Sequence, residues 1–216
     1  ILSGLVGSEM CIRDSYKPRV SRTGENSHMY TQLDVELANI FYPMLVELAV
    51  VKKTDTYQNL RDRARERHPD NPYVQGCHHR HVARRLNVVT AFTDRMGYPV
   101  LAGLVVNGST GKPGMAFEGD FETLRDKAYA FDWSTAETHF SAEIEQLKKE
   151  IVARAAPARR DRKTALDMMS AHYQTHKADY NLDIKACREA LLDLLMKGED
   201  VEDAFEIAAA QYRKKT

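Results

Sequence analysis

Apolar side chains recur at helical spacing along most of this chain. Between residues 30 and 51, leucine, isoleucine, phenylalanine and methionine return every three or four positions, which predicts a long amphipathic helix. Pro43 lies within this pattern and is expected to kink or divide the helix, because its ring displaces the preceding turn of backbone.

Two more helices are expected before the pattern changes. The first covers 56–68, with Thr54 or Asp55 as its N-cap, and the second covers about 76–96 and ends at Gly97.

A β-hairpin is expected to follow these helices. Residues 98–107 are apolar with high β propensity, residues 108–114 are dense in glycine and other turn formers, and residues 115–117 offer a return strand. A helix, a short helix and a longer helix, followed by a glycine-rich hairpin, is the element order of a winged helix-turn-helix domain.

Helical spacing returns in the second half of the chain. The expected helices cover 121–130, 134–153 with Ser134 as cap, 164–176, 182–197 and 201–212. The expected fold class is therefore mainly α with a small β-hairpin. The expected segments are a winged helix-turn-helix-like domain over 29–120, connecting helices over 121–153, a basic linker over 154–163 and a helical C-terminal region over 164–216.

The composition limits the class of protein and its expected compartment, but it does not indicate an activity. The chain carries 31 basic and 31 acidic residues, and no apolar run approaches the roughly 18 residues needed to span a bilayer. Cys77 and Cys187 are too few and too far apart for a disulfide framework or a zinc quartet. We therefore expect a cytoplasmic protein with no membrane partner and no cofactor.

The first fifteen residues, ILSGLVGSEMCIRDS, resemble translated sequencing-adapter sequence. They lack the basic region that opens a secretory leader. Residues 1–28 are therefore expected to be artefactual or disordered, with Met29 as a plausible start.

A local excess of arginine marks the third expected helix as a nucleic-acid contact. Guanidinium groups on one helical face can hydrogen-bond to guanine edges and to phosphates in the major groove. The residues expected to contact DNA on this helix are Arg80, His81, Arg84 and Arg85. An ordinary charged surface is the alternative, since Asp62 and Glu66 can pair with neighbouring arginines.

The glycine-rich turn is expected to act as the wing. Its backbone N–H groups and Lys112 could contact a phosphate, although a plain connecting hairpin would have the same composition. The segment is not a P-loop, because the glycine spacing is too short and Pro113 replaces the hydroxyl residue.

Two other functions stay open. Cys77, His78 and His81 could bring ligands together for a metal-dependent hydrolase, but no second ligand pair and no HExxH motif accompany them. The apolar stripes between Leu182 and Tyr212 could instead bind a protein partner or a second copy of the chain.

Part of the chain resembles the DNA-binding half of alkylguanine-DNA alkyltransferases. The similar features are Thr56-Tyr57 with Leu60, the run Ala83-Arg84-Arg85-Leu86, and Pro99 before an apolar strand. The stretch that matches the family's acceptor cysteine reads Leu104-Val105-Val106-Asn107. The resemblance therefore implies DNA binding without alkyl transfer.

A second resemblance covers about residues 56–209. The blocks PVLAGLVVNGSTGKPG and AFDWS are similar to uncharacterised proteins of bacteriophages and prophages. This resemblance implies a genomic setting and no activity. The function expected from the sequence is DNA binding by a phage or mobile-element protein, in regulation or defence, and the sequence shows no evident catalytic activity.

Overall fold

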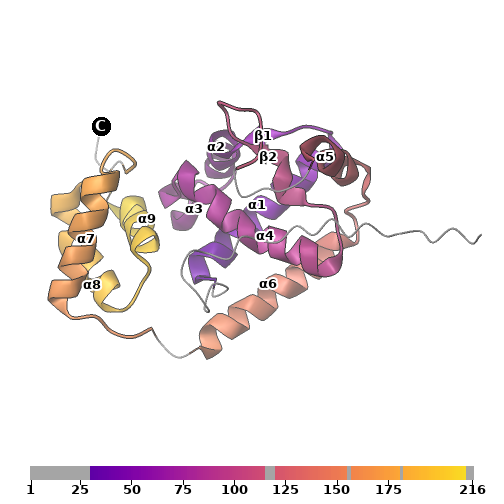
Figure 1. Ribbon diagram of the computed structural model, residues 1–216. Helices are drawn as coiled ribbons and strands as arrows, with labels where there is room; N and C mark the ends of the chain where they lie inside the picture. The colour runs from indigo at the N-terminus through magenta and orange to yellow at the C-terminus, as the bar shows by residue number, and fades with distance from the viewer. Residues whose placement is uncertain (1–29, 115–119, 155–156, 181, 213–216) are drawn as a thin grey trace, which may run out of the picture.

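The computed structural model describes residues 30–114, 120–154, 157–180 and 182–212. Within these ranges the chain is mainly helical (Figure 1). Its α-helices are α1 (Gln32–Val50), α2 (Tyr57–Arg67), α3 (Pro72–Gly76), α4 (Val82–Met96), α5 (Phe121–Ala130), α6 (Ala136–Ala153), α7 (Arg162–His176), α8 (Ile184–Met196) and α9 (Val201–Gln211). Two short 3₁₀ helices, η1 (His79–His81) and η2 (Leu101–Leu104), complete the helical elements.

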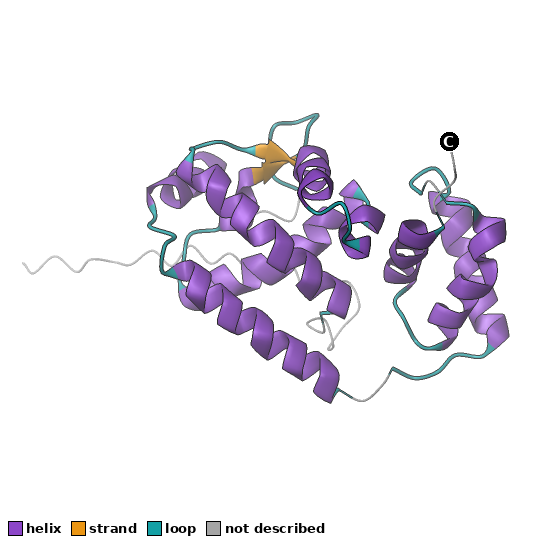
Figure 2. Cartoon of the chain, turned by 180° about the vertical axis from the view of Figure 1, so that it is seen from behind, coloured by secondary structure: helices purple, strands orange, loops and turns teal. Residues whose placement is uncertain are grey.

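The described strands form a two-stranded parallel sheet (Figure 2). β1 (Asp55–Thr56) pairs with β2 (Val105–Val106), so the two strands come from segments far apart in the sequence. The expected β-hairpin over 98–114 is therefore wrong. Most of the apolar run 98–107 is used for η2 and for two buried strand residues, because it packs against α1 and α4. The expected return strand, 115–117, lies outside the described residues.

The glycine-rich segment closes into a compact loop next to the strand β2. The Asn107 N–H donates to the Lys112 carbonyl at 2.8 Å, and the Gly111 N–H donates to the Asn107 carbonyl at 2.8 Å. Gly111 has a φ of +64°, a conformation that favours glycine. The loop therefore stays short and presents the Lys112 side chain to solvent.

Helix α1 lies at the centre of the larger body and packs against α4 and α6. It begins with a capping box in which the Thr31 and Asp34 side chains bond to each other's backbone N–H groups. Pro43 does not divide the helix, although the sequence favours a kink or a break there. Buried residues on both sides of Pro43, such as Phe41 and Leu45, hold the two halves against the same core.

The helix expected over 76–96 is not continuous: α3 ends at Gly76, and η1 and α4 follow as separate elements. Cys77 and His78 have non-helical backbone angles and separate α3 from η1. The Arg65 guanidinium donates to the carbonyls of Val74, Gln75 and Cys77, so this side chain replaces the hydrogen bonds that a continuous helix would make. The predicted end of the segment at Gly97 is confirmed, with a left-handed φ of +68°.

Two separate hydrophobic clusters divide the described residues. The larger one is built from α1 to α6, and we call residues 30–153 the N-terminal body. The smaller one is built from α7, α8 and α9, and we call residues 157–212 the C-terminal module. Figure 1 shows the module beside the body, with α9 next to α3. None of the described helices is both long enough and apolar enough to cross a membrane.

The aromatic centre of the N-terminal body gives a direct test of its packing. Phe140 on α6 stacks on Tyr42 at 3.9 Å between ring centroids and meets the Phe92 ring edge-on at 5.0 Å. Phe140→Ala is expected to lower the free energy of unfolding by about 3–5 kcal/mol, because it leaves a cavity among these rings. Urea denaturation followed by circular dichroism measures the change.

Val152→Ala is the matched control on the same helix, because the Val152 side chain is exposed. It is expected to change the free energy of unfolding by less than about 0.5 kcal/mol. Equal losses in the two variants would contradict the packing described here.

Candidate anion-binding site

Arg85, which the sequence favours as a DNA contact, is fully buried in this structure. Its Nη1 donates to Asp34 of α1, and its Nη2 donates to Asp203 at 2.7 Å and to Glu206 at 2.8 Å. Burial disfavours the charge on Arg85, but the three carboxylates outweigh this and raise its pKa. The guanidinium is therefore charged, paired and closed to any ligand in this conformation.

Arg84 is also held by carboxylates, mainly those of α9. Its Nη1 donates to Asp200 at 2.9 Å and to Glu202 at 2.8 Å, and its Nε lies 3.3 Å from Asp34. About 29% of its side chain is exposed, so Arg84 lies at the edge of the buried cluster rather than inside it.

His81 also pairs with α9, through the Glu206 carboxylate. The His81 Nδ1 lies 2.8 Å from Glu206 Oε1, and the same oxygen accepts the His78 backbone N–H at 2.8 Å. Burial lowers the pKa of His81, but the hydrogen bond and charge of Glu206 outweigh it, so the pKa is raised. Burial of Glu206 is likewise outweighed by His81 and Arg85, which lower the pKa of its carboxyl.

We call this group the charge cluster, and carboxylates outnumber guanidinium groups within it. Its members are Arg84, Arg85, His81, Asp34, Asp200, Glu202, Asp203 and Glu206. Among the described residues, one acceptor and one donor of the cluster, Asp203 Oδ2 and Arg85 Nε, are buried without a hydrogen-bond partner. Burial raises the pKa of Asp203 despite the two arginines beside it. This face of α4 is consequently closed to phosphates by contact and by charge.

Arg80 and Lys112 differ from the other residues that the sequence favours. The Arg80 side chain is 59% exposed and pairs with Asp179 of the module at 2.7 Å. Lys112 is exposed in the glycine-rich loop, and no ion pair joins it to a described residue. The structure thus leaves these two cations the most exposed, buries Arg85 fully, and pairs His81 and Arg84 with carboxylates of the module.

A cavity of about 520 Å³ lies between Arg80 and the glycine-rich loop. One wall is formed by Arg80, His79 and Ala83, at η1 and the start of α4. The other walls include the first residues of α2 and the loop, and the polar groups that line them belong to Thr56, Tyr57, Gln58, Asn107, Gly108, Ser109 and Gly114. Hydroxyl, amide and backbone groups here surround one exposed guanidinium. Such a lining suits a hydrated, negatively charged ligand.

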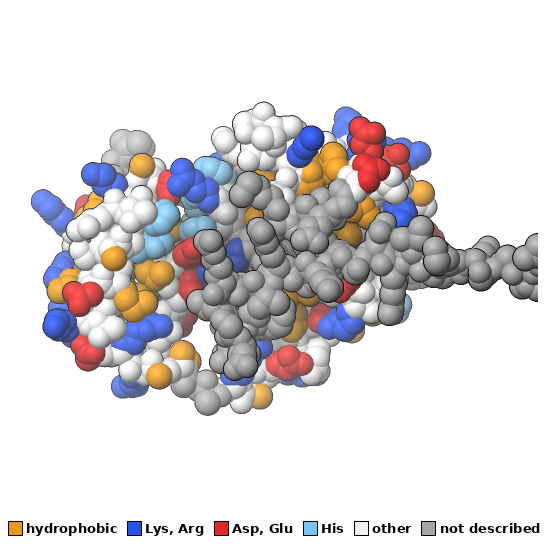
Figure 3. Space-filling model, viewed as in Figure 1, with side chains coloured by type: hydrophobic (Ala, Val, Ile, Leu, Met, Phe, Trp, Pro, Cys, Tyr) orange, Lys and Arg blue, Asp and Glu red, His pale blue; other side chains and the backbone are white. Residues whose placement is uncertain are grey.

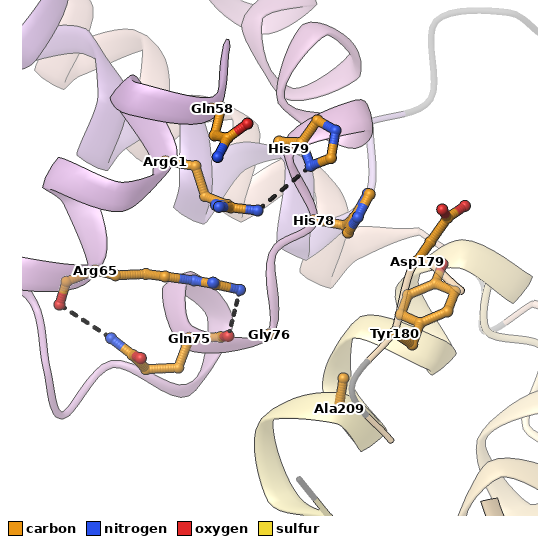
Figure 4. Close-up of a pocket in the computed structure, with 10 residues that line it drawn as sticks. All are labelled: Gln58, Arg61, Arg65, Gln75, Gly76, His78, His79, Asp179, Tyr180 and Ala209. Carbon is orange, nitrogen blue, oxygen red and sulfur yellow. Dashed lines mark hydrogen bonds between the residues drawn. The ribbon is translucent and has the colours of Figure 1, made fainter. Parts of the chain in front are cut away.

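A second cavity, of about 380 Å³, adjoins the first because both are lined by Gln58 and His79. Figure 4 shows Arg61 pointing toward His79, with Asp179 and Tyr180 of the module on the opposite side. The Arg61 Nη1 lies 3.4 Å from His79 Nδ1. The two cavities together make a track of mixed polar and apolar lining from the glycine-rich loop to the edge of the module.

Histidine side chains gather where the module meets the N-terminal body, as Figure 3 shows in pale blue. The His78 ring lies 4.2 Å from that of His79 and 6.0 Å from that of Tyr180. Burial, together with the neighbouring His79, lowers the pKa of His78 to about 4. His78 is therefore neutral near pH 7.

The cysteine and histidines that suggest a metal site do not form a set of three ligands. Cys77 is fully buried, and burial raises the pKa of its thiol well above the usual range. The His78 and His81 rings lie 5.9 Å apart between centroids, but the two residues do not share a helical face, because His78 has extended backbone angles ahead of η1. Among the described residues, no group of three or more histidine, cysteine, aspartate or glutamate side chains could hold a metal ion.

Sequence reasoning missed the acidic half of the charge cluster. Asp200, Asp203 and Glu206 recur at a spacing of three along α9, which places them on one helical face. That pattern is visible in the sequence. Its partner is not, because Arg84 and Asp200 are separated by 116 positions.

Comparison with models of protein families, with curated proteins and with solved structures finds no match to this chain.

The low pKa of His78 predicts how stability depends on pH. The unfolded chain takes up a proton at this residue below about pH 6.5, whereas the folded chain does so only near pH 4. The free energy of unfolding is thus expected to fall as the pH drops from 6.5 toward 4. Chemical denaturation at a series of pH values measures the slope, which should be shallower in His78→Gln.

The control is His68→Gln, which removes the same group from an exposed position. It is expected to keep the wild-type slope. A His78→Gln slope equal to that of the wild type would rule out His78 as the source of the pH dependence.

Proposed function

We propose that this chain is a DNA-binding protein of phage or mobile-element origin, and that it contacts phosphates through the groove between Arg80 and the glycine-rich loop. The observation that carries the proposal is the 520 Å³ cavity, in which Arg80 faces the loop that also carries Lys112. The resemblance to phage and prophage proteins supports the genomic setting.

The groups around this cavity match those that position a nucleic-acid backbone. Half or more of protein–DNA hydrogen bonds go to phosphate and sugar, from arginine, lysine, hydroxyl, amide and backbone N–H donors. The cavity offers Arg80, the Thr56 hydroxyl and the Gln58 amide. Lys112 adds a second cation to the loop. In the proposed pose these donors meet the phosphate backbone rather than base edges, so we expect them to give affinity rather than sequence preference.

The proposal keeps part of the winged-helix expectation. The start of α4 and the glycine-rich loop lie on the two sides of one groove, as a recognition helix and a wing would. The loop does this without a hairpin, because β2 pairs with β1 instead. The groove therefore supports contact with the backbone of a duplex at its edge.

The two alternative functions have less support from the described residues. A metal-dependent hydrolase lacks a convergent ligand set. A protein-interaction role for 182–212 would need a free apolar face, whereas the stripes of α8 and α9 pack against each other and against α7. The large hydrophobic side chains that are exposed are scattered, and in the described part of the chain they are Val50, Val51, Met96 and Val152.

Charge removal at the groove tests the proposal. Arg80→Ala and Lys112→Ala are each expected to weaken binding to a duplex about 3- to 10-fold, and to lower the slope of log affinity against log salt by about 1. Fluorescence anisotropy with a labelled mixed-sequence duplex of about 20 base pairs, at two salt concentrations, measures both effects.

Lys197→Ala is the control, because Lys197 is an exposed cation that pairs with Asp193 and lines neither cavity. It removes the same charge and is expected to leave affinity within about twofold of wild type. Unchanged binding in the Arg80→Ala, Lys112→Ala double variant would overturn the proposed function.

A further inference from the structure

We propose that the C-terminal module is an intramolecular competitor for DNA: α9 places carboxylates on the face of α4 that carries Arg84 and Arg85, and release of the module turns this face into a second phosphate-binding surface. The inference rests on the proposed function and adds its regulation. It also assigns a role to three residues that the groove does not use.

The first support is that the module pairs with each of the four residues favoured as DNA contacts around the start of α4. Arg80 pairs with Asp179, and His81 pairs with Glu206. Arg84 pairs with Asp200 and Glu202, while Arg85 pairs with Asp203 and Glu206. Lys112, on the glycine-rich loop, has no such partner among the described residues.

The second support is chemical equivalence between the carboxylates of α9 and the phosphates of DNA. A guanidinium group binds both anions through the same forked arrangement of N–H donors. The first two turns of α9 and its N-cap carry Asp200, Glu202, Asp203 and Glu206 on the side that meets α4. The helix thus supplies at Arg84 and Arg85 the groups that a DNA backbone would supply.

The third support concerns the contact surface between the module and the N-terminal body, which we call the seam. It can open without breaking either hydrophobic core. The two hydrophobic clusters are distinct, and the seam between them combines ion pairs and histidine contacts with the close packing of α9 on α3. Interfaces of this kind within a chain allow relative motion of the two parts. A polyanion can exchange with carboxylates here, because each lost ion pair is replaced by another.

The docked module also affects the groove itself. Asp179 neutralises Arg80, the one arginine that lines the 520 Å³ cavity. Release of the module therefore frees Arg80 and exposes Arg84 in the next helical turn. The positive surface would then extend from the glycine-rich loop along α4.

Gly76 offers a way to separate the module without touching any charge. A Cβ atom at this position would lie 2.1 Å from the Glu206 carbonyl oxygen, so a larger side chain must push α9 away. Gly76→Leu in the full chain is the first variant. Asp200→Asn with Glu202→Gln is the second, because it weakens the hold on Arg84 at partly exposed positions and keeps an N-cap residue on α9.

The experiment measures the radius of gyration by small-angle X-ray scattering and duplex affinity by anisotropy in the same samples. Both variants are expected to be more extended than wild type and to bind the duplex about tenfold more tightly. Adding Arg84→Ala to the Gly76→Leu chain should remove most of that gain. Adding Arg95→Ala, on the same helix but paired with Glu143, should not.

The results separate failure of this inference from failure of the proposed function. If the extended variants bind no more tightly while wild-type binding still depends on Arg80 and Lys112, the module is not a competitor and the groove stands. If both variants remain as compact as wild type, the module is a fixed part of the fold and the inference is overturned. If neither wild type nor variants bind the duplex, the proposed function fails and the inference fails with it.

Discussion

A single buried guanidinium, that of Arg85, joins the beginning, the middle and the end of this chain. It lies on α4 and contacts Asp34 in the first turn of α1 and two carboxylates, Asp203 and Glu206, on α9. A buried charge is tolerated only when it is paired, and removing one partner typically costs about 3–5 kcal/mol. The docking of the module and the position of α4 therefore depend on the same contact.

This arrangement puts a charged interface where many proteins of this size have an apolar one. The two hydrophobic clusters supply the stability of each part separately, while the charge cluster decides how the parts meet. The acidic excess in the cluster favours bound protons or cations at the seam. Ionic conditions should consequently affect the seam more than they affect either core.

The sequence predicts the helices well where periodicity alone determines them. The expected helix 121–130 coincides with α5, and Gly97 and Gly198 end their helices with positive φ. The hairpin was wrong because a fully buried apolar run does not reveal its period: 98–107 could be a strand or a buried turn, and its packing against α1 and α4 decides. The break before α4 depends on Arg65 and Glu206, which no local pattern identifies.

At the candidate site, too, the sequence reveals local patterns but not which of them come into contact. A basic helical face is visible in the sequence, and so is an acidic face on the last helix, but nothing local says that the two meet. Arg80 and Lys112 remain exposed, whereas Arg84 and Arg85 face a helix more than a hundred positions away. Sequence reasoning identified the cations and could not tell which of them fold inward.

Gly76 gives this interface an unusual mechanical property. Because position 76 lacks a side chain, the backbone of α9 approaches that of α3 with no intervening atoms, and an added Cβ would lie 2.1 Å from a carbonyl oxygen. Contact this close excludes water between the two backbones while the module is docked. Any outward movement of α9 therefore lets water reach the α3 backbone, so the solvent protection of the amides around Gly76 reports directly on the position of the module.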